Sequence, residues 1–226
     1  EVLDEGGTQP LVDLTRRLAN EVERLRLLYL YPSGLTESLI DAILATKVPY
    51  FDLSLQHVSR PHLRRMKRWG DGERFLERIA AIRAADPHAA FRSSFIVGYP
   101  GETEDDQAEL LDFLEEAQLD WVGFFPYSAE TGTTAATMEN QIAPELALER
   151  LREASVIQDA ITARRRDEMV GQVFEVLIDA PGVGRTVKEC PEIDGVVYVN
   201  GEHRVGTLVP CRITASRGTD VEAEPI

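Results

Sequence analysis

The chain has 226 residues, of which 43% are hydrophobic and 28% are charged, and its formal net charge is -15 at pH 7. This composition is typical of a globular protein, and no window approaches the about 18 uninterrupted apolar residues of a membrane-spanning helix. The acidic balance disfavours general nucleic-acid binding, because the surface as a whole would repel a polyanion, and it favours a basic partner or simple solubility.

The two cysteines, Cys190 and Cys211, lie near the C-terminal end without the short spacing of a metal site. We therefore expect two structural thiols in a cytoplasmic protein. The first residues, Glu1–Glu5, contain neither the basic nor the apolar region of a signal peptide. They also lack an initiator methionine, so we expect the chain to be a piece of a longer protein.

Helices and strands are predicted to alternate along the first three quarters of the chain, because apolar residues recur at helical spacing or cluster in short β-rich runs. Helices are expected over Pro10–Leu25, Thr36–Leu44, Gly72–Asp86, Thr103–Gln118 and Pro144–Glu168, and strands over Leu27–Tyr31, Tyr50–Leu55, Phe91–Val97 and Trp121–Pro126. This order predicts an α/β fold with a parallel sheet and about four strand–helix units.

The pattern changes near Met169, where short β-like runs are separated by Gly, Pro and Asp. Such runs predict a small antiparallel β-barrel, so we expect two domains, residues 1–168 and 169–226. Barrels of this kind often bind oligonucleotides, but here nine acidic residues outnumber five basic ones. Direct nucleic-acid binding is therefore not expected.

Candidate ligand-binding residues follow the predicted strands. Gln56 and His57 come directly after one strand, and Gly98 begins a Gly/Pro turn that leads from the next strand into a helix capped by Thr103. In α/β folds ligands bind at the carboxyl ends of the strands. A plain turn without a ligand, and a His57 with a structural role, are the alternatives.

Known catalytic motifs do not resolve the function. The sequence contains no GxxxxGK[ST], GxGxxG, GxSxG or HExxH motif. The residues by themselves therefore indicate a ligand-binding α/β domain followed by a β-barrel, and they specify no reaction.

Several motifs in the same order resemble the radical-SAM methylthiotransferases. They are Leu53-Ser-Leu-Gln-His-Val-Ser59, Leu63-Arg-Arg-Met-Lys-Arg68, Arg92-Ser-Ser-Phe-Ile-Val-Gly-Tyr-Pro-Gly-Glu-Thr103, Phe125-Pro-Tyr-Ser-Ala-Glu-Thr-Gly-Thr133 and Pro191-Glu-Ile-Asp-Gly-Val-Val-Tyr-Val199. The resemblance covers nearly the whole chain. It is greater to the branch that modifies an aspartate of small-subunit ribosomal protein twelve (RimO-type) than to the tRNA-modifying branch.

The resemblance implies a partial radical-SAM (β/α) barrel followed by an OB-like TRAM barrel that recruits the substrate. It also implies S-adenosylmethionine (SAM) and two 4Fe–4S clusters as cofactors. One cluster would cleave SAM to a 5′-deoxyadenosyl radical, which abstracts hydrogen from the aspartate β-carbon. The other cluster would supply sulfur, with the methyl group from another SAM, and the partner would be a basic ribosomal protein or the ribosome.

Within this resemblance, residues on the strands and at their ends become site candidates. Strand alternation places Arg92, Ser94, Ile96 and Gly98 on one face. We expect a cofactor-binding set of Gln56, His57, Arg92, Ser94 and Gly98, and a substrate-binding pair of Tyr127 and Ser128. An ion pair at the lower edge of the barrel is the alternative for Arg92, and a structural cap is the alternative for Tyr127 and Ser128.

The chain departs from the family in lacking the CxxxCxxC triplet that holds the radical-generating cluster. Iron–sulfur clusters require thiolate ligands, and the two cysteines present fall in the wrong domain. We therefore expect the C-terminal portion of an enzyme, inactive alone. A tRNA-modifying enzyme and a non-catalytic SAM-binding or docking fragment are the other hypotheses.

Overall fold

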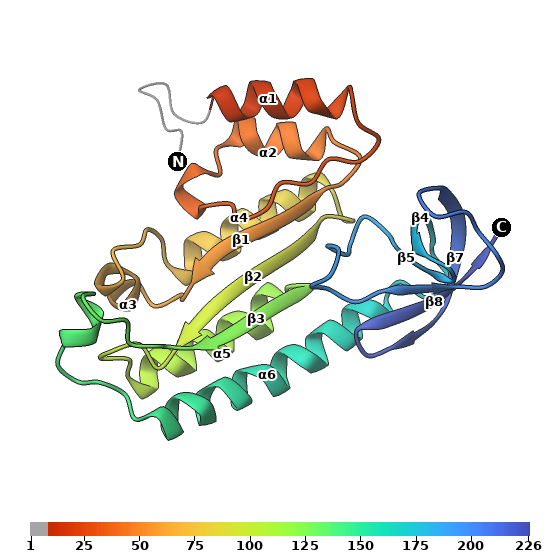
Figure 1. Cartoon of the computed structure of the whole chain (residues 1–226). Helices are drawn as coiled ribbons and strands as arrows, with labels where there is room; N and C mark the ends of the chain where they lie inside the picture. The colour runs from red at the N-terminus through yellow and green to blue at the C-terminus, as the bar shows by residue number, and fades with distance from the viewer. Residues whose placement is uncertain (1–8) are drawn as a thin grey trace.

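Residues 9–226 are described by a computed structural model, in which a parallel sheet with helices is followed by a closed barrel (Figure 1). The expectation concerning Glu1–Glu5 lies outside the described residues. Among residues 9–226, no helix combines the length and the apolar character needed to cross a membrane.

The sheet contains three parallel strands in the order β1 (Tyr50–Gln56), β2 (Ala90–Val97) and β3 (Trp121–Pro126). The crossovers pass through α3 (Arg60–Arg65) and α4 (Gly72–Ala85), and then through α5 (Glu104–Ala117). The capping box predicted for α5 is present, with the Thr103 and Asp106 side chains each bonded to the other's backbone N–H. The predicted strands β1, β2 and β3 and the predicted helices α4 and α5 are confirmed.

The two faces of the sheet differ in burial. On β2, Phe91 and Phe95 are fully buried under the helices, whereas the alternating residues Arg92, Ser94 and Ile96 are half-buried on the other face. The predicted alternation is therefore confirmed. The half-buried face carries mostly polar side chains, so one side of the sheet is the apolar core and the other is available to a ligand.

The N-terminal part corrects two predictions. Helix α1 (Gln9–Ala19) ends before the expected Leu25, and it buries Val12 while Leu11 and Leu14 of the expected apolar stripe are exposed. The strand expected over Leu27–Tyr31 is reduced to a single bridge between Leu30 and Leu53.

Tyr29 explains why this strand does not form. Its φ of 58° takes the backbone out of the extended conformation, and its N–H donates to the side-chain Oδ2 of Asp52 on β1 at 2.9 Å, not to a backbone carbonyl of that strand. The chain then continues through the short turn η1 (Pro32–Gly34) into α2 (Glu37–Leu44), whose predicted start is confirmed by the Thr36 cap. The sheet thus has three regular strands, not about four.

The barrel is built from five strands in the order β4-β5-β6-β8-β7. Their bounds are β4 (Val173–Ala180), β5 (Val183–Arg185), β6 (Val197–Val199), β7 (Leu208–Arg217) and β8 (Asp220–Pro225). Two features differ from the prediction. Strand β8 was not expected, because only Val221 and Ala223 in its acidic sequence face the core, and it pairs with β6 in parallel, so the barrel is not wholly antiparallel.

Helix α6 (Pro144–Asp167), which follows the short turn η2 (Ala135–Thr137), runs along the sheet from its carboxyl end to the barrel (Figure 1). The barrel lies at the amino end of the strands, and α3 with the loop after β3 lies at the opposite end. The Trp121 indole N–H donates to the Lys188 carbonyl at 2.7 Å, and Arg166 Nη2 lies 2.5 Å from Glu189 Oε1. Polar contacts therefore join the two domains at the amino end.

Candidate binding site at the carboxyl edge of the sheet

A groove of about 420 Å³ lies at the carboxyl ends of the three strands. It combines apolar walls with polar groups, a composition typical of sites for small organic ligands. The residues that line the groove include Gln56, Ile96, Tyr99, Phe125, Tyr127 and Ser128. Three of the predicted site residues, Gln56, Tyr127 and Ser128, therefore meet in one place.

Gln56 ends β1 in a left-handed conformation, with a φ of 70°, at an irregularity in the pairing with β2. This turn leaves Gln56 half-buried at the groove, whereas the next residue, His57, is fully buried behind it. The two neighbours therefore face different surroundings, and only Gln56 lines the groove.

The turn after β2 is organised by the buried carboxylate of Glu102. Its Oε2 accepts from the Gly98 N–H at 2.5 Å and from the Tyr99 N–H at 3.2 Å, and its Oε1 lies 3.1 Å from Arg150 of α6. Burial raises the pKa of Glu102, although Arg150 and both N–H groups oppose the rise. Glu102 therefore organises this turn, and its partner Arg150 was not predicted.

Gly98 owes its identity to packing against α6. Its φ is +76°, and a Cβ at this position would lie 2.4 Å from the Ala147 Cβ. The glycine is thus required by the close approach of a helix and by the left-handed backbone. The structure gives this position a reason that does not involve a cofactor, and its cofactor-binding role stays a prediction.

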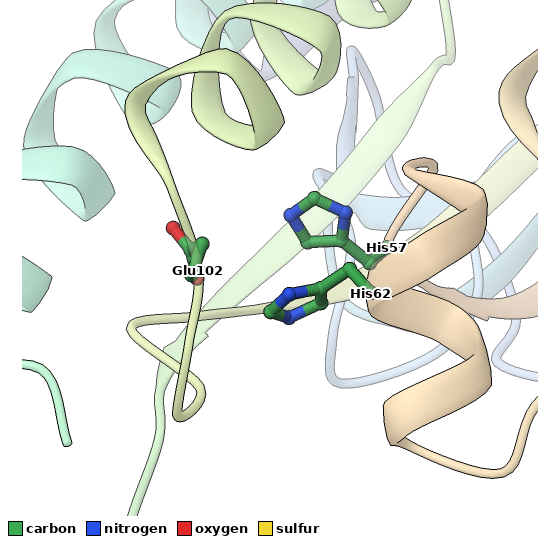
Figure 2. A group of neighbouring side chains, drawn as sticks. All are labelled: His57, His62 and Glu102. Atoms are coloured by element: carbon green, nitrogen blue, oxygen red, sulfur yellow. The ribbon is translucent and has the colours of Figure 1, made fainter. Parts of the chain in front are cut away.

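A second cluster of polar side chains lies behind the groove wall. His57 and His62 are fully buried, their ring centroids are 4.3 Å apart, and one nitrogen of each lies within 4.8 Å of a Glu102 oxygen. Figure 2 shows both rings on the same side of the cluster, opposite the loop that carries Glu102. Burial lowers the pKa of His57 to about 3 and that of His62 to about 4, so both rings are neutral near pH 7. His62 was not predicted.

Hydrogen bonds fix the backbone around this cluster. Asp106, besides capping α5, accepts from the Ser59 hydroxyl, and it lies 3.5 Å from Arg65 Nη2. Burial raises the pKa of Asp106, but the hydrogen bonds from Ser59 and Thr103 outweigh it and bring the value to about 2. Asp106 is therefore a carboxylate at all ordinary pH values, and it anchors the start of α3 to the start of α5.

Arg92 and Ser94 lie on the half-buried face of the sheet, away from the groove. Arg92 Nη1 donates to Asp194 Oδ1 at 2.8 Å, and its Nε lies 3.8 Å from Asp52. Asp194 belongs to the connection between β5 and β6 and also accepts from the Tyr50 hydroxyl. The contacts of Arg92 thus agree with the alternative of an ion pair at the lower edge of the sheet, while Ser94 lies between this edge and the groove.

Tyr127 and Ser128 follow β3. The Tyr127 N–H donates to the Val97 carbonyl at 2.8 Å, which extends the pairing of β2 and β3, and its ring packs edge-on against Tyr99 at 5.2 Å. The Tyr127 hydroxyl is buried without a hydrogen-bond partner among residues 9–226, whereas Ser128 is exposed. A buried hydroxyl beside a groove is available to a bound molecule.

The two cysteines do not form a ligand set for an iron–sulfur cluster. Cys190 packs with Tyr50 and Trp121 at the amino end of the sheet, and Cys211 lies in the core of the barrel. Burial raises the pKa of both thiols, which disfavours the thiolate that a cluster requires. Neither residue lies at the groove.

Comparison with known proteins places this geometry in a family. The Radical SAM superfamily matches residues 5–114, and the TRAM domain matches residues 170–226. The chain is 44% identical over 218 residues to the ribosomal protein uS12 methylthiotransferase RimO of Moorella thermoacetica, covering 94% of this chain and 50% of that protein. It is 43% identical to the RimO of a Nocardioides species, covering 99% of this chain and 49% of that protein.

A third relative, the RimO of Chloroflexus aurantiacus, is 41% identical over 213 residues. The match covers 89% of this chain and 47% of that protein. The chain thus spans about half the length of the curated relatives it matches. The order of the two matched regions agrees with the sheet-and-helix part and the closed barrel. The chain therefore belongs to the radical-SAM methylthiotransferase family, with a radical SAM region followed by a TRAM domain.

Proposed function

We propose that the chain is part of a SAM-dependent methylthiotransferase that modifies an aspartate of ribosomal protein uS12. The observation that carries this proposal is the groove at the carboxyl edge of the sheet, where Gln56, Tyr127 and Ser128 converge. It is supported by relatives that bear this activity in their names and that are up to 44% identical to the chain.

SAM would occupy the groove and the adjoining half-buried face of the sheet. Ile96 and Tyr99 offer apolar contact, and the Gln56 amide and the Tyr127 hydroxyl offer hydrogen bonds. When bound, SAM and its reducing cluster supply the radical that removes hydrogen from the aspartate. The residues of this chain bind, orient and shield the reactants.

The complete reaction is proposed for the longer protein. Cys190 and Cys211 are buried in separate packing clusters, and we propose that neither is a cluster ligand. The relatives are about twice as long as the matched region, so the cluster-binding thiolates are proposed to lie in the part of that length that this chain does not cover. The chain alone is then expected to be inactive.

A basic protein is the proposed partner of the barrel. Residues 169–226 contain nine acidic and five basic side chains. Three of the basic ones are already paired: Arg185 contacts Asp179, Arg217 lies 2.5 Å from Glu222, and buried Lys188 lies 4.0 Å from Asp120. This leaves little positive charge for a phosphate backbone and favours a cationic polypeptide.

The test uses the full-length protein, reconstituted with iron and sulfide, and mixed with SAM and uS12. The expected product is uS12 with a methylthio group in place of one hydrogen on an aspartate, detected by mass spectrometry. Modification of tRNA with uS12 unchanged would assign the chain to the other branch. Absence of any SAM-dependent product from cluster-loaded protein would overturn the proposal.

The place of SAM is tested separately by calorimetry. Gln56→Ala in the full-length protein is expected to weaken SAM binding about tenfold, because about 1.4 kcal/mol is typical of one lost hydrogen bond. Glu77→Ala, an exposed change on α4, is the matched control and leaves binding unchanged. Equal affinity of both variants would place SAM elsewhere.

A further inference from the structure

The cluster of His57, His62 and Glu102 is formed by side chains that the proposed function does not use. Both imidazoles are fully buried, and neither Nε2 atom has a hydrogen-bond partner within residues 9–226. Leaving a buried N–H unbonded costs about 1–3 kcal/mol, so two such groups on neighbouring rings point to a bound molecule that pairs with them.

The protonation of each ring follows from its other nitrogen. His57 Nδ1 accepts from the Ser59 backbone N–H at 3.1 Å, and His62 Nδ1 lies 2.7 Å from Arg65 Nη2. A backbone N–H and a guanidinium only donate, so both Nδ1 atoms are acceptors. Each neutral ring therefore carries its proton on Nε2, and the two rings offer two N–H donors.

This arrangement is unsuited to a metal ion, although two histidines and a glutamate are common metal ligands. A metal-binding imidazole uses a bare nitrogen and donates from the other one, which is the reverse of the pattern here. The Glu102 carboxylate is also occupied by two backbone N–H groups and by Arg150. Arg65, beside His62, would further repel a cation.

The local charge also disfavours an anion. Arg65 lies 3.5 Å from the Asp106 carboxylate, and Arg150 lies 3.1 Å from the Glu102 carboxylate. The two positive charges are thus matched by two negative ones before anything binds. A neutral acceptor satisfies both N–H groups without leaving a buried net charge.

We propose that His57 and His62 bind one neutral oxygen acceptor, a water molecule, between their Nε2–H groups. One nitrogen of each ring and one Glu102 oxygen lie within 4.8 Å of one another, so a single small molecule placed among them can contact all three side chains. This water joins the segment after β1 to the turn after β2, and those two segments carry Gln56 and Tyr99 of the groove. Its role is to hold the groove walls in register.

Nuclear magnetic resonance of the 226-residue chain tests the site. Between pH 7 and pH 5, the ring ¹⁵N signals of His57 and His62 are expected to show a protonated Nε2 and a bare Nδ1. Each Nε2–H is expected to show a cross-relaxation signal to a bound water. A bare Nε2 on either ring, or the lack of a water signal from both N–H groups, would overturn the proposal.

Zinc addition distinguishes the metal alternative. Equimolar Zn²⁺ is expected to leave the ring signals of His57 and His62 unchanged, while exposed His88 shows what non-specific zinc contact looks like. Stoichiometric displacement of the two buried signals by zinc would establish a metal site and refute the bound water.

Two variants of His62 separate the bound water from general packing. His62→Asn keeps an acceptor for Arg65 but removes the inner donor, so exchange of the His57 Nε2–H with solvent should rise about tenfold, equivalent to one hydrogen bond. His62→Gln places an N–H donor near the Nε2 position and is expected to restore slow exchange. Equal exchange in both variants would contradict a shared acceptor.

Discussion

The two ends of the sheet use buried polar residues in opposite ways. At the amino end, side chains of the two domains bond to each other, as in the pairs of Arg92 with Asp194 and Arg166 with Glu189. At the carboxyl end, the Tyr127 hydroxyl and both buried histidines keep donors without partners among residues 9–226, next to a groove. The amino end therefore connects the sheet part to the barrel, and the carboxyl end carries the groove that we propose as the ligand site.

This difference teaches that polarity alone does not locate a binding site. Arg92 looks like a ligand-binding residue because it lies on the half-buried face of a strand, yet its guanidinium is held by two carboxylates. The informative property is whether the buried polar group already has a partner. This measure supports the ligand site that we propose at the carboxyl end.

The largest expected effect on stability is at the contact between α6 and the barrel, at the amino end of the sheet. Arg166→Met removes the partner of the fully buried Glu189 and a guanidinium that lies over the Trp121 ring. An unpaired buried charge costs about 3–5 kcal/mol, so the free energy of unfolding should fall by that amount in urea titrations. The control, Arg164→Ala, is exposed on the same helix and should change it by less than about 0.5 kcal/mol. A small loss in Arg166→Met would mean that the domains are joined only loosely.

A smaller effect is expected at the turn that shapes the groove. Gly98→Ala places a Cβ against Ala147 in a left-handed backbone and should cost about 2–3 kcal/mol. Gly132→Ala has a φ of +88° but open space around it, so it should cost only about 1 kcal/mol, as expected for the backbone alone.

Combining Gly98→Ala with Ala147→Gly should recover part of the loss, because the clash disappears while the backbone strain stays. Thermal unfolding of these three variants and the unaltered chain measures both contributions. If Gly98→Ala lowers the free energy of unfolding no more than Gly132→Ala does, α6 does not pack closely enough on this turn to exclude a Cβ.

The smallest effect concerns pH. The unfolded chain protonates its histidines near pH 6.5, whereas His57 and His62 in the folded chain take up protons only near pH 3 and pH 4. The unfolded state therefore binds more protons as the pH falls from about 6.5, and stability falls with it. Between pH 7 and pH 5.5, each buried histidine should contribute about 1 kcal/mol to this loss.

The pH prediction is checked by urea titrations at both pH values. His62→Asn should lose about 1 kcal/mol less than the unaltered chain over this range. His88→Asn, at an exposed position, should follow the unaltered chain. A steep pH dependence that persists in His62→Asn would show that another group is responsible.

Local patterns in the sequence predicted the elements but not the contacts between them. The capping box of Thr103 and Asp106, the three strands and α6 were predictable because their signals lie within a few residues. The failed strand at Leu27–Tyr31 depends on the Asp52 carboxylate, which binds the Tyr29 N–H from 23 residues away. The strand propensity of a segment takes no account of a hydrogen-bond partner so far away in the sequence.

The site was predictable only in part for the same reason. Gln56, Tyr127 and Ser128 follow strand ends, and parallel strands bring their ends together. Arg92 donates a hydrogen bond to Asp194, which lies 102 positions later, and Arg150 donates one to Glu102, which lies 48 positions earlier. No spacing rule connects residues so far apart. The sequence around Arg150 and Arg166 does not predict their burial, because arginine side chains on helices are mostly exposed to solvent.

The dimensions of α6 carry a consequence for how this chain tolerates insertions and deletions. Arg150 near its start binds Glu102 beside the groove, and Arg166 near its end binds Glu189 of the barrel. The two positions are about 24 Å apart along the axis at 1.5 Å per residue. Deleting one residue between them turns one arginine by about 100°, and deleting a whole turn shortens the span by about 5.4 Å. The length of this helix is therefore fixed at both ends.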